Sequence, residues 1–363
     1  MAKGPTVYDV AQRAGVSIAT VSFAFRRSER VKDSTREAIL AAARDLGYVP
    51  NASARGLARG RTGALGLYSF DYLVDARPET VDPATGGARG VEDESRPNDD
   101  LRAFPLYVDE VQRGVELECW HRGYALMIGG GGHAIERAVV DVVGRVDGLV
   151  VFPQTMPAGL LQRVTRRIPV VELAHPSRED YVNHVTVDNA AGMRELTRHL
   201  ITGHARHDLV FVGSLSTPDT KERFEGFRAA MRAHGLPVRH ERPSNRGPLI
   251  RQAAAVVHGL LERRGLPEGL VCATDHEALA VMDALIDAGI EIPRRVTVTG
   301  FDGIAAGRVS RPTLTTVRQP MEQMGRVAVD ILISRLGSAD GPPTNRRLLV
   351  RTVLRESCGC QPG

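Results

Sequence analysis

The segment TVYDVAQRAGVSIATVSFAFRRSERVKDSTREAILAAARDLGYVPN (6–51) decides the fold at the beginning of this 363-residue chain. Thr6 stands where it can cap a helix, with Asp9 three residues later as the acid of a capping box, and apolar residues then recur at helical spacing. Gly15 ends that helix, and Ser17 is placed to cap the next one. The pattern therefore predicts two short helices joined by a tight turn.

The second helix of this segment is predicted to bury one face and to expose the other. The residues on or near its outer face are Ile18, Ala19, Ser22 and Phe23. A third helix is predicted to begin at a second capping box, formed by Ser34 and Glu37, and to end at Gly47. We therefore expect three short helices around one small core, with outer side chains that can reach base edges in DNA.

The basic residues of the chain are concentrated in this region and in the linker that follows it. Residues 1–62 contain 11 Lys and Arg against 5 Asp and Glu, a net charge of +6, whereas the remaining residues have a net charge of −2. A small basic module on a near-neutral body is the charge distribution expected of a protein that binds duplex DNA.

The linker NASARGLARGRT (51–62) contains a short helical pattern. Asn51 can cap a helix over residues 52–58, which ends before Gly60. A helix of this length is unstable alone, so it needs a partner in order to form. Without the preceding domain, the same residues would fit a flexible linker.

Residues 6–66 closely resemble the amino-terminal region of the lac repressor family of bacterial transcription regulators. The matching motifs are TVYDVAQRAGVS (6–17), ATVS (19–22), STRE (34–37), AAARDLGYVPN (41–51) and ARGLARGRTGALG (54–66). The resemblance implies that the second helix enters the major groove and that the hinge helix inserts Leu57 into the minor groove. The DNA-binding residues predicted on this basis are Thr6, Tyr8, Ser17, Ile18, Ala19, Thr20, Ser22, Phe23, Arg26, Arg30, Asn51, Ala54 and Leu57.

Two positions of the second helix depart from the family pattern. Phe23 stands where members commonly carry a polar or basic residue, and Arg26 stands where they commonly carry asparagine. Phenylalanine cannot hydrogen-bond a base, so Phe23 either contacts a thymine methyl group or turns partly inward. The usual operator of the family therefore cannot be assumed for this chain.

Beyond residue 63, short apolar runs alternate with helical segments. Examples are the predicted strands ALGLYSF (64–70), DLVFVGS (208–214) and VTVTGFD (296–302) and the predicted helix MEQMGRVAVDILISRL (321–336). The alternation predicts parallel α/β sheets. This part resembles the effector-binding core of the same family and of periplasmic binding proteins, which implies two α/β subdomains with a cleft between them.

The predicted organisation is a small all-α domain followed by this two-subdomain α/β core. The all-α domain covers 1–50, the hinge helix and linker 51–62, and the core 63–363. Subdomain one is predicted at about 63–174 and 320–336, and subdomain two at about 175–318 and 337–356. The predicted crossings lie near Ala174 to His175, Arg318 to Pro320, and Leu336.

Residues 71–103 form an acidic insertion in this pattern, with 9 acidic and 4 basic residues and little periodicity. We expect a mobile loop at the mouth of the cleft. A lid over the effector and an insertion without a task both fit its composition.

The candidate effector-binding residues follow predicted strands or begin helices next to them. Ligands of open α/β sheets bind beyond the carboxyl ends of the strands. Matches to the family pattern and approximate alignment select Gln154, Asp219, Arg223, Asp275 and Asp302. Phe70 or Tyr72 is the candidate stacking surface for a ligand, because the segment RHERPSNRGP (239–248) lacks the aromatic that several relatives have there. An arginine among carboxylates suits a polyhydroxyl ligand such as a sugar, and an ion pair between subdomains is the alternative role.

No pattern of an enzyme, a metal site or a membrane span is found. GGGGH (129–133) lacks the glycine spacing of a dinucleotide site, and no nucleophile motif appears. Cys358 and Cys360 have no second ligand pair nearby in the sequence, and His199, His204 and His207 match a structural turn of the family. We therefore expect no catalytic residue, no metal and no cofactor.

The sequence as a whole predicts a homodimeric transcriptional regulator, a repressor that binds a palindromic operator in double-stranded DNA and responds to a small-molecule effector in the sugar class. No signal segment precedes the first helix, so a cytoplasmic location is expected. A non-sugar effector or no effector at all remains open within the same family. A solute-binding receptor is a more distant alternative, and it would lack the DNA-binding domain.

Overall fold

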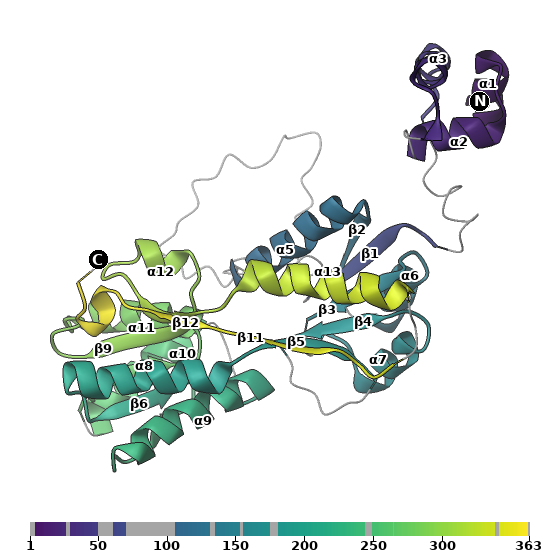
Figure 1. Ribbon diagram of the computed structural model, residues 1–363. Coiled ribbons are helices and arrows are strands. Elements are labelled where there is room, and N and C mark those ends of the chain that lie inside the picture. Colours follow the sequence, from purple (N-terminus) through teal and green to yellow (C-terminus); the bar gives the residue numbers. More distant parts are fainter. Residues whose placement is uncertain are drawn as a thin grey trace, which may run out of the picture. The chain divides into compact units, whose positions relative to one another are not determined.

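The structure of the protein is a computed structural model (Figure 1). It describes residues 4–26, 30–49, 61–69, 106–130, 135–152, 155–174, 181–243, 249–263, 265–337 and 341–361. The predicted hinge helix and the acidic insertion at 71–103 lie outside these residues. The chain divides into two compact units, Met1–Gly63 and Ala64–Gly363.

The first unit contains the three predicted helices, α1 (Val7–Ala14), α2 (Ile18–Arg26) and α3 (Asp33–Leu46). The backbone N–H of Thr6 donates to Oδ2 of Asp9 over 2.7 Å, as the first capping box requires. Gly15 ends α1 with a φ of 64°, a left-handed conformation that favours glycine. The N–H of Thr20 donates to Oγ of Ser17 over 3.1 Å at the start of α2. The local signals for the first two helices are therefore confirmed.

The start of the third helix differs from the prediction. Lys32, and not Ser34, is the N-cap of α3, and it makes no side-chain capping hydrogen bond. The carbonyl of Lys32 already accepts a hydrogen bond from the N–H of Arg36, which places Ser34 inside the first turn. Apolar packing fixes this helix instead. Fully buried Val10, Val21 and Ile39, one from each helix, meet in the core of the unit.

The second unit begins with a six-stranded sheet of order β11-β5-β4-β3-β1-β2, in which all neighbours run parallel. Its strands are β1 (Ala64–Ser69), β2 (Ala125–Gly130), β3 (Gly148–Val151), β4 (Val170–Leu173), β5 (Asn183–Val187) and β11 (Asn345–Leu348). Helices α5 (Leu106–Arg122) and α13 (Met321–Gly337) cover one face, and α6 (Ile135–Val143) and α7 (Ala158–Thr165) cover the other. Because both faces are covered, all residues of β3, β4 and β5 are buried, and β3 is continuously apolar.

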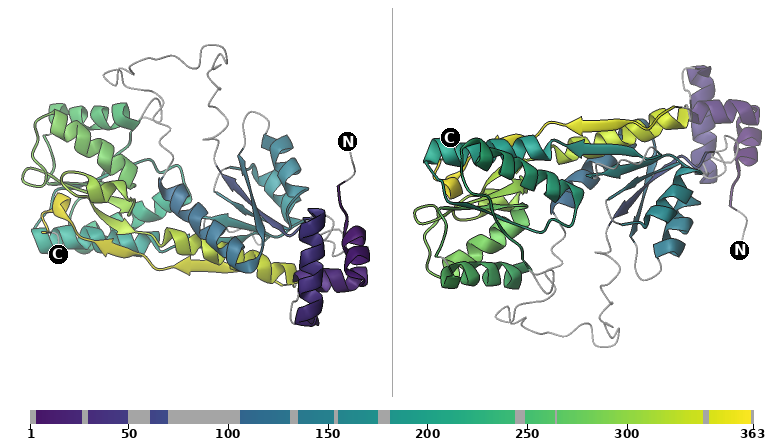
Figure 2. Two further views of the ribbon diagram at one scale, coloured as in Figure 1. Left: turned by 90° about the horizontal axis from the view of Figure 1, so that it is seen from above. Right: turned by 90° about the horizontal axis from the view of Figure 1, so that it is seen from below.

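A second six-stranded sheet has the order β12-β10-β9-β8-β6-β7. Its strands are β6 (Leu209–Val212), β7 (Arg239–Glu241), β8 (Gly269–Cys272), β9 (Thr297–Asp302), β10 (Thr315–Arg318) and β12 (Arg351–Val353), of which only β12 runs antiparallel to its neighbour. Helices α8 (Asn189–His204) and α9 (Pro218–Ala233) pack on one face, and α10 (Leu249–Arg263) and α11 (Asp275–Asp287) on the other. Two short helices, α12 (Ala306–Val309) and η2 (Glu356–Cys358), complete this half. Figure 2 shows helices on both sides of each sheet. The predicted two-sheet α/β core is confirmed.

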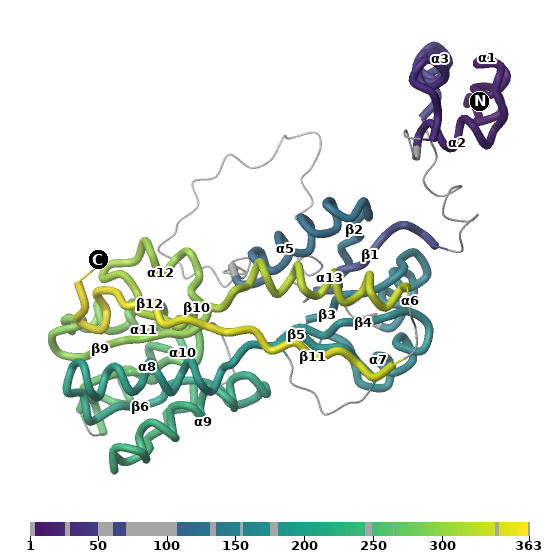
Figure 3. Tube along the Cα trace, in the orientation of Figure 1, coloured from purple at the N-terminus to yellow at the C-terminus, as the bar shows by residue number. Residues whose placement is uncertain are grey.

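The chain passes between the two sheets three times, and its path can be followed in Figure 3. The first crossing lies at Asp188, because β5 pairs with β4 and so belongs to the first sheet. The second lies at Gln319 and Pro320, between β10 and α13. The third lies between β11 and β12, because β11 pairs with β5.

Two of the predicted boundaries are therefore wrong, the crossing near Ala174 to His175 and the crossing near Leu336. Each was placed one strand too early. In both cases an additional parallel strand extends the first sheet before the chain leaves it.

In the described part of the chain, every helix is too short or too polar to cross a membrane.

Candidate functional site

The exposed face of α2 carries apolar side chains with few neighbours in the first unit. Ile18 and Phe23 are each 41% exposed, while Val21 and Ala24 on the opposite face are buried. Of the two orientations expected for Phe23, the structure shows the outward one. The ring is therefore available for an apolar contact with a base, which an inward ring could not make.

The other described residues of the predicted DNA-binding set lie around this face. Ser17, Ala19, Arg30 and Tyr8 are exposed, and Thr6, Thr20 and Ser22 are partly buried. The hydroxyl of Thr6 donates to Oδ2 of Asp9 over 2.7 Å, so a phosphate contact would have to compete with this bond. Arg26 ends α2. The remaining predicted positions Asn51, Ala54 and Leu57 lie outside the described residues.

A buried polar cluster lies at the carboxyl ends of the second sheet, centred on Arg223 of α9. The guanidinium of Arg223 donates from Nε to Oδ1 of Asn189 over 2.9 Å and from Nη1 to the carbonyl of Ala273 over 2.8 Å. Its Nη1 also lies 3.1 Å from Oδ1 of Asp302, and its Cζ lies 3.9 Å from the ring centroid of Phe301. Only 3% of Arg223 is exposed, so its geometry is fixed from several sides.

Two carboxylates accompany this arginine. Asp219, in the first turn of α9, lies 3.6 Å from Nη2 of Arg223, and Asp302 accepts a hydrogen bond of 2.7 Å from Nε2 of Gln319. Burial raises the pKa of Asp302, while the nearby guanidinium of Arg223 opposes the rise. Asp302, the last residue of β9, has a φ of 125°, a backbone conformation that is rare for a residue with a side chain. We call Arg223, Asp219, Asp302, Asn189 and Gln319 the Arg223 cluster.

Asp275 was predicted to contact the effector, but its oxygens are occupied by the protein. Oδ2 accepts from the backbone N–H groups of Gly303 and Ile304 over 2.7 and 2.8 Å, and Oδ1 accepts from the hydroxyl of Thr316. Asp275 is fully buried, and burial together with repulsion from Asp302 raises its pKa to about 7. Its geometry is that of a positioning residue, because it holds the turn that follows Asp302.

Tyr107 on α5 brings subdomain one to the same cluster. Its hydroxyl oxygen is buried and has no hydrogen-bond partner among the residues that the structure describes. Burial raises the pKa of Tyr107, and the negative charges of Asp302 and Asp219 raise it further. A second buried atom, Oε1 of Gln319, likewise lacks a partner within the described ranges. A buried polar atom without a partner is costly, which makes both atoms candidates for contact with a ligand.

The Arg223 cluster is connected to all three crossings between the sheets. Asn189 follows the first crossing, and its Nδ2 donates to Oε2 of Glu222 over 3.3 Å. Glu222 in turn accepts a bond of 3.0 Å from Nη2 of Arg347 on β11, just before the third crossing. Gln319, which binds Asp302, lies at the second crossing. Hydrogen bonds therefore link the cluster to every segment that joins the two subdomains.

Sequence reasoning found Arg223, Asp219 and Asp302 but missed three of the neighbouring residues. Asn189 and Gln319 follow β5 and β10, so the rule that selected the other candidates applied to them as well. No sequence signal marked Tyr107, since only the packing of α5 brings it to the other subdomain. Phe70 and Gln154, which were also predicted, lie outside the described residues.

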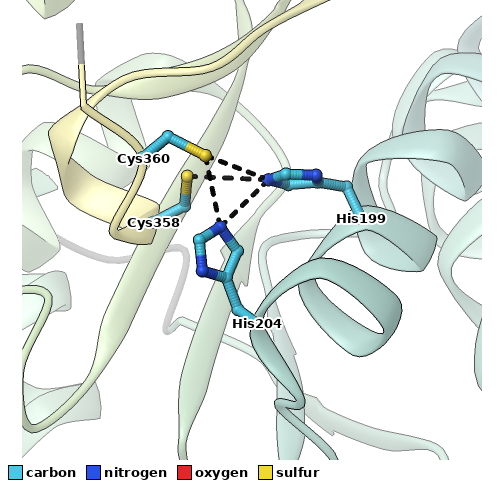
Figure 4. Close-up of side chains that lie close together, drawn as sticks. All are labelled: His199, His204, Cys358 and Cys360. Atoms are coloured by element: carbon cyan, nitrogen blue, oxygen red, sulfur yellow. Dashed lines mark hydrogen bonds between the residues drawn. The ribbon is translucent and has the colours of Figure 1, made fainter.

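The residues that were expected to bind no metal converge in the structure. His199 and His204 of α8 lie beside Cys358 and Cys360, with all four ligand atoms within 4.8 Å of one another (Figure 4). The two cysteines, which have no second ligand pair nearby in the sequence, thus have one beside them in the fold. The histidines are about 150 positions away in the sequence and adjacent only in the fold. His207, the third histidine considered, is outside this group.

Comparisons with known proteins agree with this architecture. The family model "Bacterial regulatory proteins, lacI family" matches residues 6–51, and the model "Periplasmic binding protein-like domain" matches residues 197–358. The HTH-type transcriptional repressor PurR of Erwinia tasmaniensis is 29% identical over 92% of this chain and 91% of its own length. PurR of Yersinia pestis bv. Antiqua is 27% identical over 98% of each chain.

Solved structures show the same fold over nearly the whole length. A lac repressor dimer bound to operator and the anti-inducer ONPF aligns with a TM-score of 0.76 at 20% identity, covering 98% of this chain and 99% of that one. The complex of the transcriptional regulator CelR with cellobiose aligns with a TM-score of 0.65 at 25% identity, covering 97% and 99%. The chain thus belongs to the lac repressor family of bacterial regulatory proteins, and it is a DNA-binding transcriptional repressor and not an enzyme.

Proposed function

We propose that this repressor binds a palindromic operator as a homodimer and that a small polyhydroxylated effector, of the sugar class, binds at the Arg223 cluster and changes its operator affinity. The observation that carries the proposal is a pair of buried atoms, on Tyr107 and Gln319, that have no hydrogen-bond partner among the described residues and lie beside the charges of Arg223 and Asp302. These groups belong to both subdomains, so a ligand between them would contact both.

In this proposal α2 lies in the major groove and reads bases mainly through apolar contacts. Ile18 and Phe23 project from its exposed face and can contact thymine methyl groups. Arg26, Arg30, Tyr8 and Thr6 would contact the phosphate backbone, which fixes the register of the helix without reading sequence. Leu57 would enter the minor groove at the centre of the operator, as the resemblance implies. Because the operator is bacterial DNA, we place the protein in the cytoplasm.

A sugar fits the chemistry of the Arg223 cluster. Each sugar hydroxyl can donate one hydrogen bond and accept others, and the cluster offers donors on Arg223 and Tyr107 and acceptors on Asp302, Asp219 and Gln319. Two structural relatives support this ligand class, the CelR complex with cellobiose and a LacI family regulator from Enterococcus faecium with bound ribose. Charged groups in a buried site discriminate strongly against ligands that leave them unpaired.

The route from effector to operator would run through the three crossings. A ligand can shift the angle between the subdomains only if it binds the two arrangements with different affinity. The ligand contacts are connected to the crossing segments by three interactions. These are the hydrogen bond between Arg223 and Asn189, the hydrogen bond between Gln319 and Asp302, and the ion pair of Glu222 with Arg347. A contact between Tyr107 and a ligand held by subdomain two would increase the difference in ligand affinity between the two arrangements of the subdomains.

Dimer formation is supported by apolar side chains on the outer surface of subdomain two. Ile250 and Leu261 on α10 and Ile286 on α11 are between 39% and 50% exposed. Helices α10 and α11 pack against each other, so these residues can contribute to one surface. A dimer presents two copies of α2, which is the arrangement that a palindromic operator requires.

The proposal is tested in two steps with the full-length protein. First, selection from a random duplex library should return a palindrome, and one dimer should occupy both of its half-sites at once. Second, fluorescence anisotropy on that operator should be repeated with a panel of pentoses, hexoses and disaccharides, with planar nucleobases as the non-sugar arm. A response confined to sugars supports the proposal. A response to nucleobases alone, or to no compound in the presence of intact operator binding, contradicts the effector class.

A further inference from the structure

Two histidines and two cysteines gather at the end of the second sheet where α8 terminates (Figure 4). Nε2 of His199 lies 3.1 Å from Nε2 of His204, 3.5 Å from Sγ of Cys360 and 3.9 Å from Sγ of Cys358. Nε2 of His204 lies 3.3 Å from Sγ of Cys360. We call these four residues the Cys2His2 cluster.

Hydrogen bonds among the four side chains cannot account for this arrangement. A neutral imidazole nitrogen carries either one proton or one lone pair, so Nε2 of His199 can form one good hydrogen bond and yet it has three neighbours at contact distance. A single cation at the centre would satisfy all four atoms at once. The two imidazole rings stand almost perpendicular, at 83°, and both direct Nε2 toward the sulfur atoms.

The separations match those around tetrahedral zinc. Bond lengths of about 2.3 Å to sulfur and about 2.05 Å to nitrogen place two nitrogens about 3.4 Å apart and nitrogen and sulfur about 3.6 Å apart in a regular tetrahedron. The observed values are 3.1 Å between the nitrogens and 3.3, 3.5 and 3.9 Å between nitrogen and sulfur. Only shifts of a few tenths of an ångström would be needed to receive the ion.

The local chain conformation provides this geometry. Ala205, with a φ of 50°, ends α8 directly after His204. Gly359, with a φ of 102°, reverses the chain between the two cysteines, a conformation that favours glycine, and so lets both sulfurs approach the same histidine. Gly203 lies against the ring of His199, where an added Cβ would be only 3.2 Å from Nδ1.

The hydroxyl of Thr315 can support the cluster from outside. Its Oγ1 lies 3.1 Å from Sγ of Cys358 and can donate to a thiolate there. Such outer hydrogen bonds orient and stabilise metal ligands.

From this geometry we propose that His199, His204, Cys358 and Cys360 bind one zinc ion in a closed, structural Cys2His2 site. Four protein ligands leave no open position for substrate, which is the pattern of structural and not of catalytic zinc. Two thiolates with two imidazoles favour zinc over magnesium or calcium, which prefer oxygen ligands.

Zinc at this position would join two distant segments of subdomain two. His204 and Cys360 are 156 positions apart in the sequence. The segment that carries the cysteines is already bound to the sheet, through Ser357 to the carbonyl of Val298 over 2.6 Å and through Glu356 to the N–H of Thr313 over 2.8 Å. The metal would attach the end of α8 to this segment, which follows the third crossing in the sequence.

The test uses the full-length, untagged protein, because a histidine tag binds metal itself. Elemental analysis of the reduced protein should find about one zinc per chain. Replacement by Co²⁺ should produce a thiolate-to-cobalt charge-transfer band and the intense visible bands of tetrahedral cobalt. C360S and H204A should each weaken zinc binding more than about tenfold in competition with a chelator. C119A and H207A are matched controls that change a cysteine and a histidine outside the cluster, and both should keep the metal.

Several results would overturn the proposal. Reduced wild-type protein that binds neither zinc nor cobalt would do so, as would cobalt spectra without a thiolate band. Equal zinc affinity in C360S and in C119A would show that the metal lies elsewhere. A stable disulfide between Cys358 and Cys360, combined with no zinc binding once that disulfide is reduced, would show that the two cysteines form a redox pair and not a metal site. The cobalt measurement needs no variant, so it remains decisive if C360S or H204A fails to fold.

Discussion

The two ends of α8 lie in polar clusters of opposite character. At its first residue, Asn189 contacts Arg223 in a cluster of charges that reaches both subdomains. At its last residue, His204 contacts Cys360 in a group of sulfur and imidazole atoms confined to subdomain two. The 16 residues of the helix separate the two clusters by about 24 Å. One helix thus joins the site proposed to bind the effector and the site proposed to bind zinc.

The two clusters differ in the kind of ligand that their side chains can bind. The Arg223 cluster is internally paired, but among the described residues Oε1 of Gln319, and the hydroxyl of Tyr107 beside the cluster, have no hydrogen-bond partner. The Cys2His2 cluster brings four possible ligand atoms within 4.8 Å of one another, and we propose that a zinc ion binds there. Effector binding should therefore act on the arrangement of the subdomains, whereas metal binding should act on stability. The predictions below separate these two roles.

The largest effect is expected from R223A. The substitution leaves the buried Asp302 without its guanidinium partner, and breaking a buried pair in this way costs about 3–5 kcal/mol. Urea unfolding should show this loss, while the zinc content remains at the wild-type level. A variant of wild-type stability would mean that the ion pair is not part of the native cluster, and loss of zinc would mean that the two ends of α8 are not independent.

Removal of zinc should have the next largest effect. If the free metal is about 100-fold above its dissociation constant, its loss should cost about 2.7 kcal/mol of stability. Thermal unfolding with and without a chelator measures this cost. The concentration of sugar that changes operator binding should stay the same below the unfolding transition. A shift in that concentration would make the Cys2His2 cluster part of the effector response.

Y107F should change stability and ligand affinity in opposite directions. Removing an unpartnered buried hydroxyl should stabilise the free protein by about 1 kcal/mol, and removing a ligand contact should weaken effector binding by a similar amount. Unfolding and calorimetric titration with the responsive sugar provide the two values. Parallel changes would indicate that the hydroxyl of Tyr107 has a partner within the protein.

The smallest effect concerns Glu277 on α11, near the Arg223 cluster. Burial raises the pKa of Glu277 to about 7 from an ordinary value near 4.5, so the folded state holds this proton more tightly than the unfolded chain. The resulting stability is complete below pH 4.5 and is lost as the pH rises through about 7.

Glutamine stays neutral at every pH, so E277Q should match the wild type near pH 4, where the carboxyl group is protonated in both states, and exceed it by at least about 1 kcal/mol at pH 8. Unfolding free energies at the two pH values test this sign. The raised pKa would be contradicted if the stability of E277Q, relative to that of the wild type, were lower at the higher pH than at the lower pH.

Local patterns predicted the first unit well, and they predicted the core less completely. Caps at Thr6 and Ser17 and the left-handed Gly15 are local signals, and each appears in the structure. The exposure of Phe23 followed from helical spacing, although only the structure decided between its two orientations. The crossings could not be located from local patterns, because pairing of β5 with β4 and of β11 with β5 depends on the whole sheet.

The two clusters show the same limit. Arg223 and Asp302 follow a rule on strand ends, and Asn189 and Gln319 obeyed that rule without being selected. Asp275 obeyed it too, yet its oxygens serve the turn after Asp302 and not a ligand. The histidines and cysteines had no local spacing that marks a metal site, since the fold alone brings segments about 150 residues apart together.

The central claim, that a ligand at the Arg223 cluster controls operator binding, is tested most directly by D302N. Asparagine keeps an oxygen that can accept from Gln319 but removes the charge beside Arg223. Operator anisotropy should be measured for both proteins over a titration with the sugar that acts on the wild type. We predict equal operator affinity without sugar and a response in D302N that requires at least about tenfold more of it. An identical titration curve for the two proteins would contradict the claim.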